Sequence, residues 1–441
     1  MNCRSRLARI ALPALLLAAL PGGASADVFV LKNGTEIDGF PGVRNARKKE
    51  ITIGTEKGPR TVSEAVIKEI RPSADAAADF AKYMAGLGPK DADGAAALGV
   101  WAKGKGLEEP AKEAFRRALA LKADHAVAKE GMGWLKVDGK WLNPEEAEAW
   151  RKEDAFRQEI VKKYQDLMGE APEVVVTPHW KMVDFLGDGK VKQRAEDLEK
   201  SFAEALRVLG SESWKDRGLC VACEGQEQYH LWLEKDAKTL RGFGAKYVEF
   251  AKQATGIKWT EPPVLGRSDL PDRVSMHAAV IHSAGHVLFN NWKGHNREQP
   301  FWLEEGFGGW MEDRVLNSMS SYCFALGKPG GYGSSARDTK DWEVELPDWK
   351  SLCKAAAARN EFLPLEKLDE LPAGEYSRRE VGQAFSLVAF LILEKGMDRF
   401  QSFVLSVKKG TASKHAIREA YGQDFNALEP EWRRFLQSGK W

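Results

Sequence analysis

The sequence predicts a multidomain α+β protein, because the pattern of its 441 residues changes character twice along the chain. Residues 27–72 hold short apolar alternations separated by turn signals, which is typical of a small β module. Residues 73–170 are alanine-rich with helical periodicity, and we expect a helical hairpin followed by a linker helix. From residue 173 to the end, strand-like and helix-like runs alternate and then give way to a helical C-terminal part.

Residues 1–26 have the pattern of a signal peptide. Three arginines precede an apolar run at residues 11–20, and an Ala-Ser-Ala cleavage pattern ends at Ala26. The apolar run falls short of the roughly 20 residues that a membrane span needs. We therefore expect an exported protein, periplasmic or secreted, whose mature chain has no integral membrane span.

The charge balance argues against nucleic acid as a partner. The whole chain has a formal net charge of +1, and removal of the three arginines of the signal peptide lowers it by three, to −2. A nearly neutral chain has no electrostatic attraction toward nucleic acid or an anionic membrane surface. We therefore expect no nucleic-acid partner.

Four cysteines lie beyond the signal peptide, at Cys220, Cys223, Cys323 and Cys353. An oxidising compartment permits disulfides, and four cysteines allow three pairings, which the sequence leaves open. Cys220 and Cys223 fall in a strand-like run, whereas a redox pair would need its reactive cysteine at the N-terminus of a helix. We expect either a disulfide or buried thiols at these two positions.

The two N-terminal segments each resemble a known small module. An Asn33-Gly34 turn between alternating apolar residues predicts a hairpin, and the Leu-x-Asn-Gly-x-x-Ile-x-Gly opening resembles SH3-like barrel modules. Pro110 suits the first turn of a helix, and the hairpin at residues 92–134 resembles a single tetratricopeptide-type unit. Such units normally stack in threes or more, so a plain helical spacer is the favoured alternative.

Two histidines at helical i, i+4 spacing, His282 and His286, carry the strongest chemical signal in the chain. On a helical wheel at about 100° per residue they fall within about 40° of each other. The opposite side of the predicted helix, residues 277–289, is apolar, and His277 falls with that side and is expected to be structural. Such a helix can pack on a core and turn two imidazoles into a cleft, which is the geometry that zinc requires.

A second predicted helix supplies a third candidate ligand, Glu305, on the side opposite its apolar face. Glu304 falls between the two faces, and Gly308, Gly309 and Glu312 lie near Glu305. Two imidazoles and one carboxylate form a ligand set that zinc accepts. We therefore predict a Zn²⁺ site held by Glu305 and the two histidines.

Residues 275–315 resemble the active site of gluzincin metallopeptidases, in particular the bacterial peptidase MA-like group. That family has His-Glu-x-x-His followed by a Trp-Leu-x-Glu-Gly helix. The matching residues are His282, His286, Trp302, Leu303, Glu305 and Gly306. The helical C-terminal part is similar to that family in order and spacing, so the resemblance extends over residues 173–441. It implies a zincin-like peptidase fold in which the two histidines and the glutamate hold zinc.

Three departures from the family pattern concern catalysis. Ser283 occupies the position of the family's general-base glutamate, and loss of a general base typically costs about 10²–10⁴ in rate. Gly309 stands where the family often has a second carboxylate that orients the metal histidines. Loss of such a carboxylate typically weakens metal binding about 10–100-fold. Val381 stands where relatives have a tyrosine in a C-terminal helix.

These observations, with the family resemblance, favour an exported zinc-binding protein that is a weak or inactive peptidase and acts as a binding module for a protein or peptide. Two alternatives stay open. In the first, the chain is an active zinc peptidase in which Glu304 or Glu312 replaces the missing base. In the second, it is a structural envelope protein without metal. Whether the chain is an enzyme is therefore undecided at the level of sequence.

Overall fold

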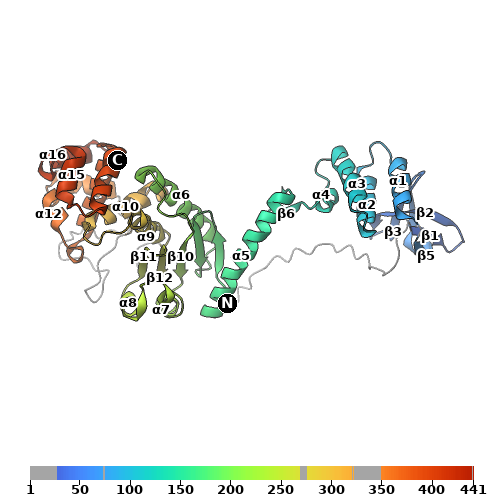
Figure 1. The fold of residues 1–441 in the computed structure, drawn as a ribbon, viewed down its shortest axis with the longest axis horizontal. Helices are drawn as coiled ribbons and strands as arrows, with labels where there is room; N and C mark the ends of the chain where they lie inside the picture. The colour runs from blue at the N-terminus through green and yellow to red at the C-terminus, as the bar shows by residue number, and fades with distance from the viewer. Residues whose placement is uncertain (1–26, 73–74, 269–275, 320, 322–348, 440) are drawn as a thin grey trace. The chain divides into compact units, whose positions relative to one another are not determined.

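The computed structural model describes residues 27–72, 75–268, 276–319, 321, 349–439 and 441 (Figure 1). It confirms a multidomain α+β fold with an N-terminal antiparallel sheet and a helical C-terminal part. The chain divides into two compact units between Lys152 and Glu153. The expected signal peptide and Cys323 lie outside the described residues.

The first unit begins with a five-stranded antiparallel sheet in the order β4-β3-β2-β1-β5. Its strands are β1 (Asp27–Leu31), β2 (Glu36–Asn45), β3 (Glu50–Thr55), β4 (Gly58–Ser63) and β5 (Ile67–Pro72), with a 3-10 turn at Glu64–Val66. The predicted turn joins β1 to β2: Asn33 Oδ1 accepts a hydrogen bond from the Thr35 amide at 3.0 Å, and Gly34 has a φ of +84°. That φ lies in the left-handed region, which glycine adopts at little cost.

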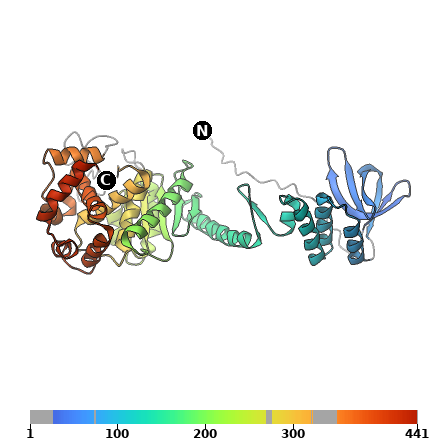
Figure 2. The same ribbon diagram turned by 90° about the horizontal axis from the view of Figure 1, so that it is seen from above.

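Helices make up most of the remaining first unit, beside the sheet (Figure 2). They are α1 (Ala76–Gly86), α2 (Ala92–Gly104), α3 (Glu108–Leu121) and α4 (Ala126–Gly131), followed by a short hairpin of β6 (Leu135–Val137) and β7 (Lys140–Leu142). The Phe115 ring of α3 packs against Gly99 and Gly131, where an added Cβ would lie 2.6 and 2.3 Å from ring carbons. Arg117 also donates hydrogen bonds to three carbonyl groups at the end of α1.

The second unit contains a mixed five-stranded sheet in the order β11-β12-β10-β9-β8. Its strands are β8 (Glu173–Val176), β9 (Trp180–Asp184), β10 (Gly218–Cys223), β11 (Gly256–Trp259) and β12 (Val264–Ser268). The three central strands are parallel, whereas both edge strands, β8 and β11, pair antiparallel. Around it lie the part of α5 (Pro144–Met168) that follows Lys152, α6 (Val191–Leu209), α7 (Gln226–Lys235), a 3-10 turn (Ala237–Thr239) and α8 (Gly244–Ala251).

The two faces of this sheet belong to two separate cores, because side chains alternate along each strand. On one face, Cys220 of β10 packs with α6 and with the helices that follow the sheet. On the other face, Cys223 packs with α7, α8 and Tyr164 of α5. Cys220, Cys223 and Cys353 are buried free thiols, so the buried-thiol expectation is confirmed for the first two.

Eight α-helices follow the sheet among the described residues. They are α9 (Met276–Asn291), α10 (Phe301–Leu316), α11 (Trp349–Ala358), α12 (Leu365–Glu370), α13 (Arg378–Leu393), α14 (Met397–Lys408), α15 (Ser413–Tyr421) and α16 (Phe425–Ser438), with a 3-10 turn at Ala373–Glu375. Within the second unit, α12, α15 and α16 gather beyond α10, away from the sheet (Figure 1). None of the described helices is both long and apolar enough to cross a membrane.

Candidate metal centre

The three predicted ligands converge in the second unit. His282 and His286 lie one turn apart on α9, and Glu305 comes from the second turn of α10. The Nε2 atoms of the two histidines are 3.1 Å apart, and each lies close to a different oxygen of Glu305, at 3.3 Å for His282 and 3.1 Å for His286. Zinc binds nitrogen and oxygen ligands at about 2.0–2.1 Å, so two tetrahedral ligands lie about 3.3–3.4 Å apart. One zinc ion therefore fits among the three side chains.

The electrostatics of the triad favour a shared cation. The two histidines are at most 1% exposed and Glu305 is fully buried. Burial by itself would raise the pKa of Glu305, but the charges and hydrogen bonds of the two imidazoles outweigh it and hold that pKa well below its ordinary value. Glu305 is thus an ionised carboxylate in the core, and a buried charge is stable only when it is paired or bound to a metal.

Two glycines allow α9 and α10 to approach each other at this point. A Cβ at Gly308 would lie 2.9 Å from Nε2 of both His282 and His286, and a Cβ at Gly285 would lie 3.0 Å from the Gly308 Cα. A glycine inside a helix costs about 1 kcal/mol relative to alanine. Glycine is needed at position 308 despite this cost, because the two imidazoles lie directly over the backbone of α10.

A carboxylate stands beside the first histidine, but not at the position that the family pattern indicates. Gly309 faces Met319 and Phe385, where an added Cβ would meet side-chain atoms at 3.0 and 3.2 Å. Glu312, nearly one turn further along α10, is fully buried and has its Oε2 3.5 Å from His282 Nδ1. Gly309 thus leaves its position without a carboxylate, as predicted, but Glu312 places one 3.5 Å from His282 Nδ1 from another position on α10.

The Glu312 carboxylate is itself held in place. The backbone amide of Ser321 donates to both of its oxygens, at 3.2 and 3.1 Å. Nδ1 and Nε2 lie on opposite sides of an imidazole ring, so Glu312 approaches His282 from the side away from the other ligands. Carboxylates in this position fix the tautomer and orientation of a metal-binding histidine. Its geometry suits a positioning role rather than that of a replacement base.

Ser283 follows His282 on α9 and is 1% exposed. Its Oγ has no hydrogen-bond partner among the residues that the structure describes. Glu304, the other candidate base, is tied to a different set of groups, since its Oε2 accepts hydrogen bonds from Asn290 Nδ2 at 2.9 Å and Gln299 Nε2 at 3.0 Å. A hydroxyl group is not a base near neutral pH, so the position next to His282 cannot perform that task.

The surroundings of the triad differ from the expected cleft. Almost every residue of α9 is buried, and α10 is buried on the ligand side as well as on the apolar side. Gly306 explains one side of this enclosure, because an added Cβ there would lie 2.5 Å from the Ala384 carbonyl oxygen of α13. The ligands thus lie inside the core of the second unit. His277, predicted to be structural, has its Nε2 2.9 Å from Asp197 Oδ2.

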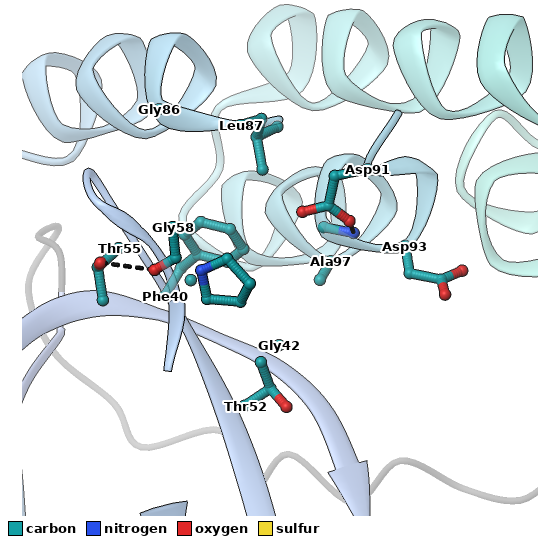
Figure 3. A pocket seen from close by; sticks show the side chains of 13 residues that line it. Phe40, Gly42, Thr52, Thr55, Gly58, Gly86, Leu87, Asp91, Asp93 and Ala97 are labelled. Carbon is teal, nitrogen blue, oxygen red and sulfur yellow. Dashed lines mark hydrogen bonds between the residues drawn. The ribbon is translucent and has the colours of Figure 1, made fainter. Parts of the chain in front are cut away.

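A separate cavity of about 180 Å³ lies in the first unit, between the sheet and helices α1 and α2 (Figure 3). Phe40 and several glycines line it, together with two aspartates. Both aspartates already have partners: Asp91 accepts a hydrogen bond from the Gly94 amide at 2.8 Å, and Asp93 contacts His125 Nε2 at 2.9 Å. The cavity therefore presents no uncommitted charge to a ligand.

Within the described residues, the group of His282, His286 and Glu305 is the cluster suited to hold a metal ion. No protein-family model matches this chain, and no curated protein matches it in sequence. The chemistry of the site is therefore inferred from its own side chains and from the resemblance of its motif.

Proposed function

We propose that this chain is an exported, zincin-like protein that binds one zinc ion, has little or no peptidase activity, and acts as a binding module for a protein or peptide. The observation that carries the proposal is the convergence of two imidazole nitrogens and one ionised carboxylate at 3.1–3.3 Å, next to a serine in place of a base. The match to the His-x-x-x-His and Trp-Leu-x-Glu-Gly pattern supports the same conclusion.

The side chains have distinct roles in this proposal. His282, His286 and Glu305 would hold the metal, and Glu312 would orient His282. When bound, zinc would supply a Lewis acid that polarises a carbonyl oxygen. Hydrolysis also needs a group that accepts a proton from water and delivers it to the leaving amine. Ser283 cannot do this, so we expect the rate of cleavage to be about 10²–10⁴ lower than with a glutamate at this position.

The test is to restore the glutamate. The mature protein and its Ser283→Glu variant would be loaded with zinc and incubated with a casein-like substrate. We expect about one zinc per chain in both proteins, and chelator-sensitive cleavage that is at least about 10²-fold faster in the variant. Ser402→Glu, at an exposed serine on α14, is the matched control and should cleave no faster than the unaltered protein.

Two other outcomes would contradict the proposal and favour one of the alternatives. Chelator-sensitive cleavage by the unaltered protein, lost in His282→Ala, would establish an active peptidase with a displaced base. Absence of zinc from both proteins after loading would favour the structural alternative without metal.

A further inference from the structure

The cavity of the first unit has apolar walls that solvent reaches. Thr52 and Gly54 of β3 line it, whereas Ile53 between them belongs to the small core on the opposite face of the sheet. Leu87 and Ala97 bring apolar groups to the cavity from the helical side (Figure 3). Thr52, Gly54, Leu87 and Ala97 are all partly exposed, so the helices do not close this face of the sheet.

The cavity has the size of one large apolar side chain. Its volume of about 180 Å³ is comparable to the roughly 150 Å³ of an engineered apolar cavity that binds benzene. The Phe40 ring lies over Gly54, where an added Cβ would be 2.2 Å from a ring carbon, and forms one wall. Because Asp91 and Asp93 already have partners, the cavity suits an uncharged side chain.

Strand β4 borders the cavity and forms one edge of the sheet. Gly58 and Pro59, at the start of β4, line the cavity. Among the described residues, β4 pairs with β3 on one side and with no strand on the other. Pro59, Arg60 and Thr61 are exposed. The free edge of β4 is therefore accessible to an added strand beside the cavity.

The turn at residues 56–57 fixes which backbone groups of β4 point outward. Thr55 and Gly58 flank this two-residue turn and pair with each other, and in such a hairpin the flanking pair exchanges backbone hydrogen bonds. Bonded and non-bonded pairs then alternate along the ladder. The amide of Thr61 and the carbonyl groups of Pro59 and Thr61 consequently point away from β3 and toward the free edge.

A second copy of the chain fits this edge less well than a segment of another protein. Two β4 strands can pair about a two-fold axis at Thr61, and directly opposite residues then share one face of the sheet. The residues that the second copy would turn to the cavity side are Pro59, Thr61 and Ser63, and none of them is large and apolar. The cavity would stay empty, whereas another protein can supply a large apolar side chain.

We propose that the first unit binds an extended segment of a partner protein as an added strand along β4, with one large apolar side chain of that segment in the cavity. The outward groups of Pro59 and Thr61 bond to its backbone. Phe40, Leu87 and Ala97 contact its apolar side chain. Addition of a strand to a sheet edge is a recurring mode of peptide recognition, in which backbone bonds give affinity and pockets give specificity. The inference rests on the proposed binding role of the chain and places that role away from the metal centre.

Two pools of N-acetylated, C-amidated heptapeptides provide the probe. Both are randomised over threonine, serine, lysine and glutamate around a central residue, which is phenylalanine in one pool and serine in the other. Retention of each pool on the immobilised mature protein is measured by mass spectrometry. We expect at least about tenfold greater retention of the phenylalanine pool, because burial of the ring is favourable. N-methylation of the amides on both sides of the phenylalanine should abolish the difference, since it removes donors that pair with β4.

Two variants test the two parts of the site. Ala97→Leu puts a larger side chain into the cavity and should abolish the phenylalanine preference, whereas Ala81→Leu, the same change at an exposed alanine of α1, should keep it. Thr61→Pro removes an outward amide and should weaken retention of the phenylalanine pool by about fivefold or more. Thr61→Ala keeps the amide and should retain the pool as well as the unaltered protein does.

Equal retention of the two pools by the unaltered protein would overturn the inference, and this comparison does not depend on how any variant folds. A phenylalanine preference that survives in Ala97→Leu would also overturn it, and so would undiminished retention by Thr61→Pro. A chain that sediments as a dimer, and as a monomer in Thr61→Pro, would assign the edge of β4 to a second copy instead.

The same measurement on His282→Ala separates this inference from the metal proposal. A preference that persists in His282→Ala supports the β4 site, whatever the zinc content of the protein. A preference that is lost in His282→Ala, but kept in Ala97→Leu, would place the peptide at the metal centre and overturn the inference. Ala97→Leu should leave the zinc content unchanged, because the proposed ligands lie in the second unit.

Discussion

Glu312 lies outside the proposed ligand set but contacts one of its members, His282. Its carboxylate lies 3.5 Å from His282 Nδ1 and receives two hydrogen bonds from the Ser321 amide. A histidine that donates from Nδ1 to a carboxylate presents the lone pair of Nε2 to the metal. At the residue scale, we therefore expect Glu312 to favour the tautomer of His282 that zinc would require.

Replacement of Glu312 by glutamine tests this role. The Glu312→Gln variant should bind zinc about 10–100-fold more weakly, because a neutral amide lacks the negative charge that makes the His282 imidazole a stronger metal ligand. Competition with a chromophoric chelator measures the affinity. Asp313→Asn is the matched control, since Asp313 is also buried but contacts Lys350 Nζ at 3.0 Å instead of a ligand. An equal loss of affinity in both variants would contradict a specific role for Glu312.

The sequence predicted the three candidate ligands, but not the contact between Glu312 and His282. His282, His286 and Glu305 could be predicted because helical spacing places them on one face of each helix. Glu312 follows Glu305 by seven residues, two helical turns, so its position on the same face was visible too. Its contact with His282 was not visible, because it depends on how closely α9 and α10 pack.

At the scale of elements, the close approach of α9 and α10 is what brings the ligands together. The sequence indicated two amphipathic helices with a cleft between their polar faces, but the structure encloses both helices. The reason is tertiary: α10 packs against α6 and α13 as well as α9. Periodicity within one helix carries no information about the helices that later cover its polar face.

Replacement of glycine by alanine should destabilise the protein at one helical position and should not destabilise it at another. Gly308→Ala should destabilise the second unit by about 1–3 kcal/mol, because its Cβ would crowd both imidazoles at 2.9 Å. Gly104→Ala, at the end of α2 with no atom within 4 Å of the added Cβ, should be neutral or stabilising by up to about 1 kcal/mol. Denaturant unfolding measures both changes. A stabilising effect of Gly308→Ala would contradict the close packing.

Asp188, in the turn before α6, should make the stability of the folded protein depend on pH. A hydrogen bond from Arg194 holds the pKa of Asp188 at about 2, below its ordinary 3.8. The ionised carboxylate therefore stabilises the fold above about pH 4, and this contribution is lost as the pH falls toward 2. The melting temperature of Asp188→Asn should lie below that of the unaltered protein at pH 7, and the gap should narrow below pH 4. A gap that stays constant down to pH 2 would argue against the ion pair.

At the scale of the whole molecule, the proposed metal centre belongs to one unit of two. All three ligands and Glu312 lie beyond Glu153, in the second unit. A ligand that binds only the folded state stabilises it by about 2.7 kcal/mol at a concentration 100 times its Kd. That stabilisation should be confined to the unit that holds the ligands.

Hydrogen exchange with and without chelator tests this confinement. Removal of zinc should increase exchange in α9 and α10, and leave the sheet and helices of the first unit unchanged. Peptides from α2 and α3 serve as the internal control. Equal changes in both units would mean that the metal acts elsewhere, or that the two units are energetically coupled.

The most direct test of the central claim is the zinc content of the purified mature protein, measured together with that of His282→Ala after both have been exposed to zinc and dialysed. The proposed metal centre predicts close to one zinc per chain in the unaltered protein and almost none in the variant. Zinc missing from both, or retained equally by His282→Ala, would contradict the claim that these three side chains form a metal site.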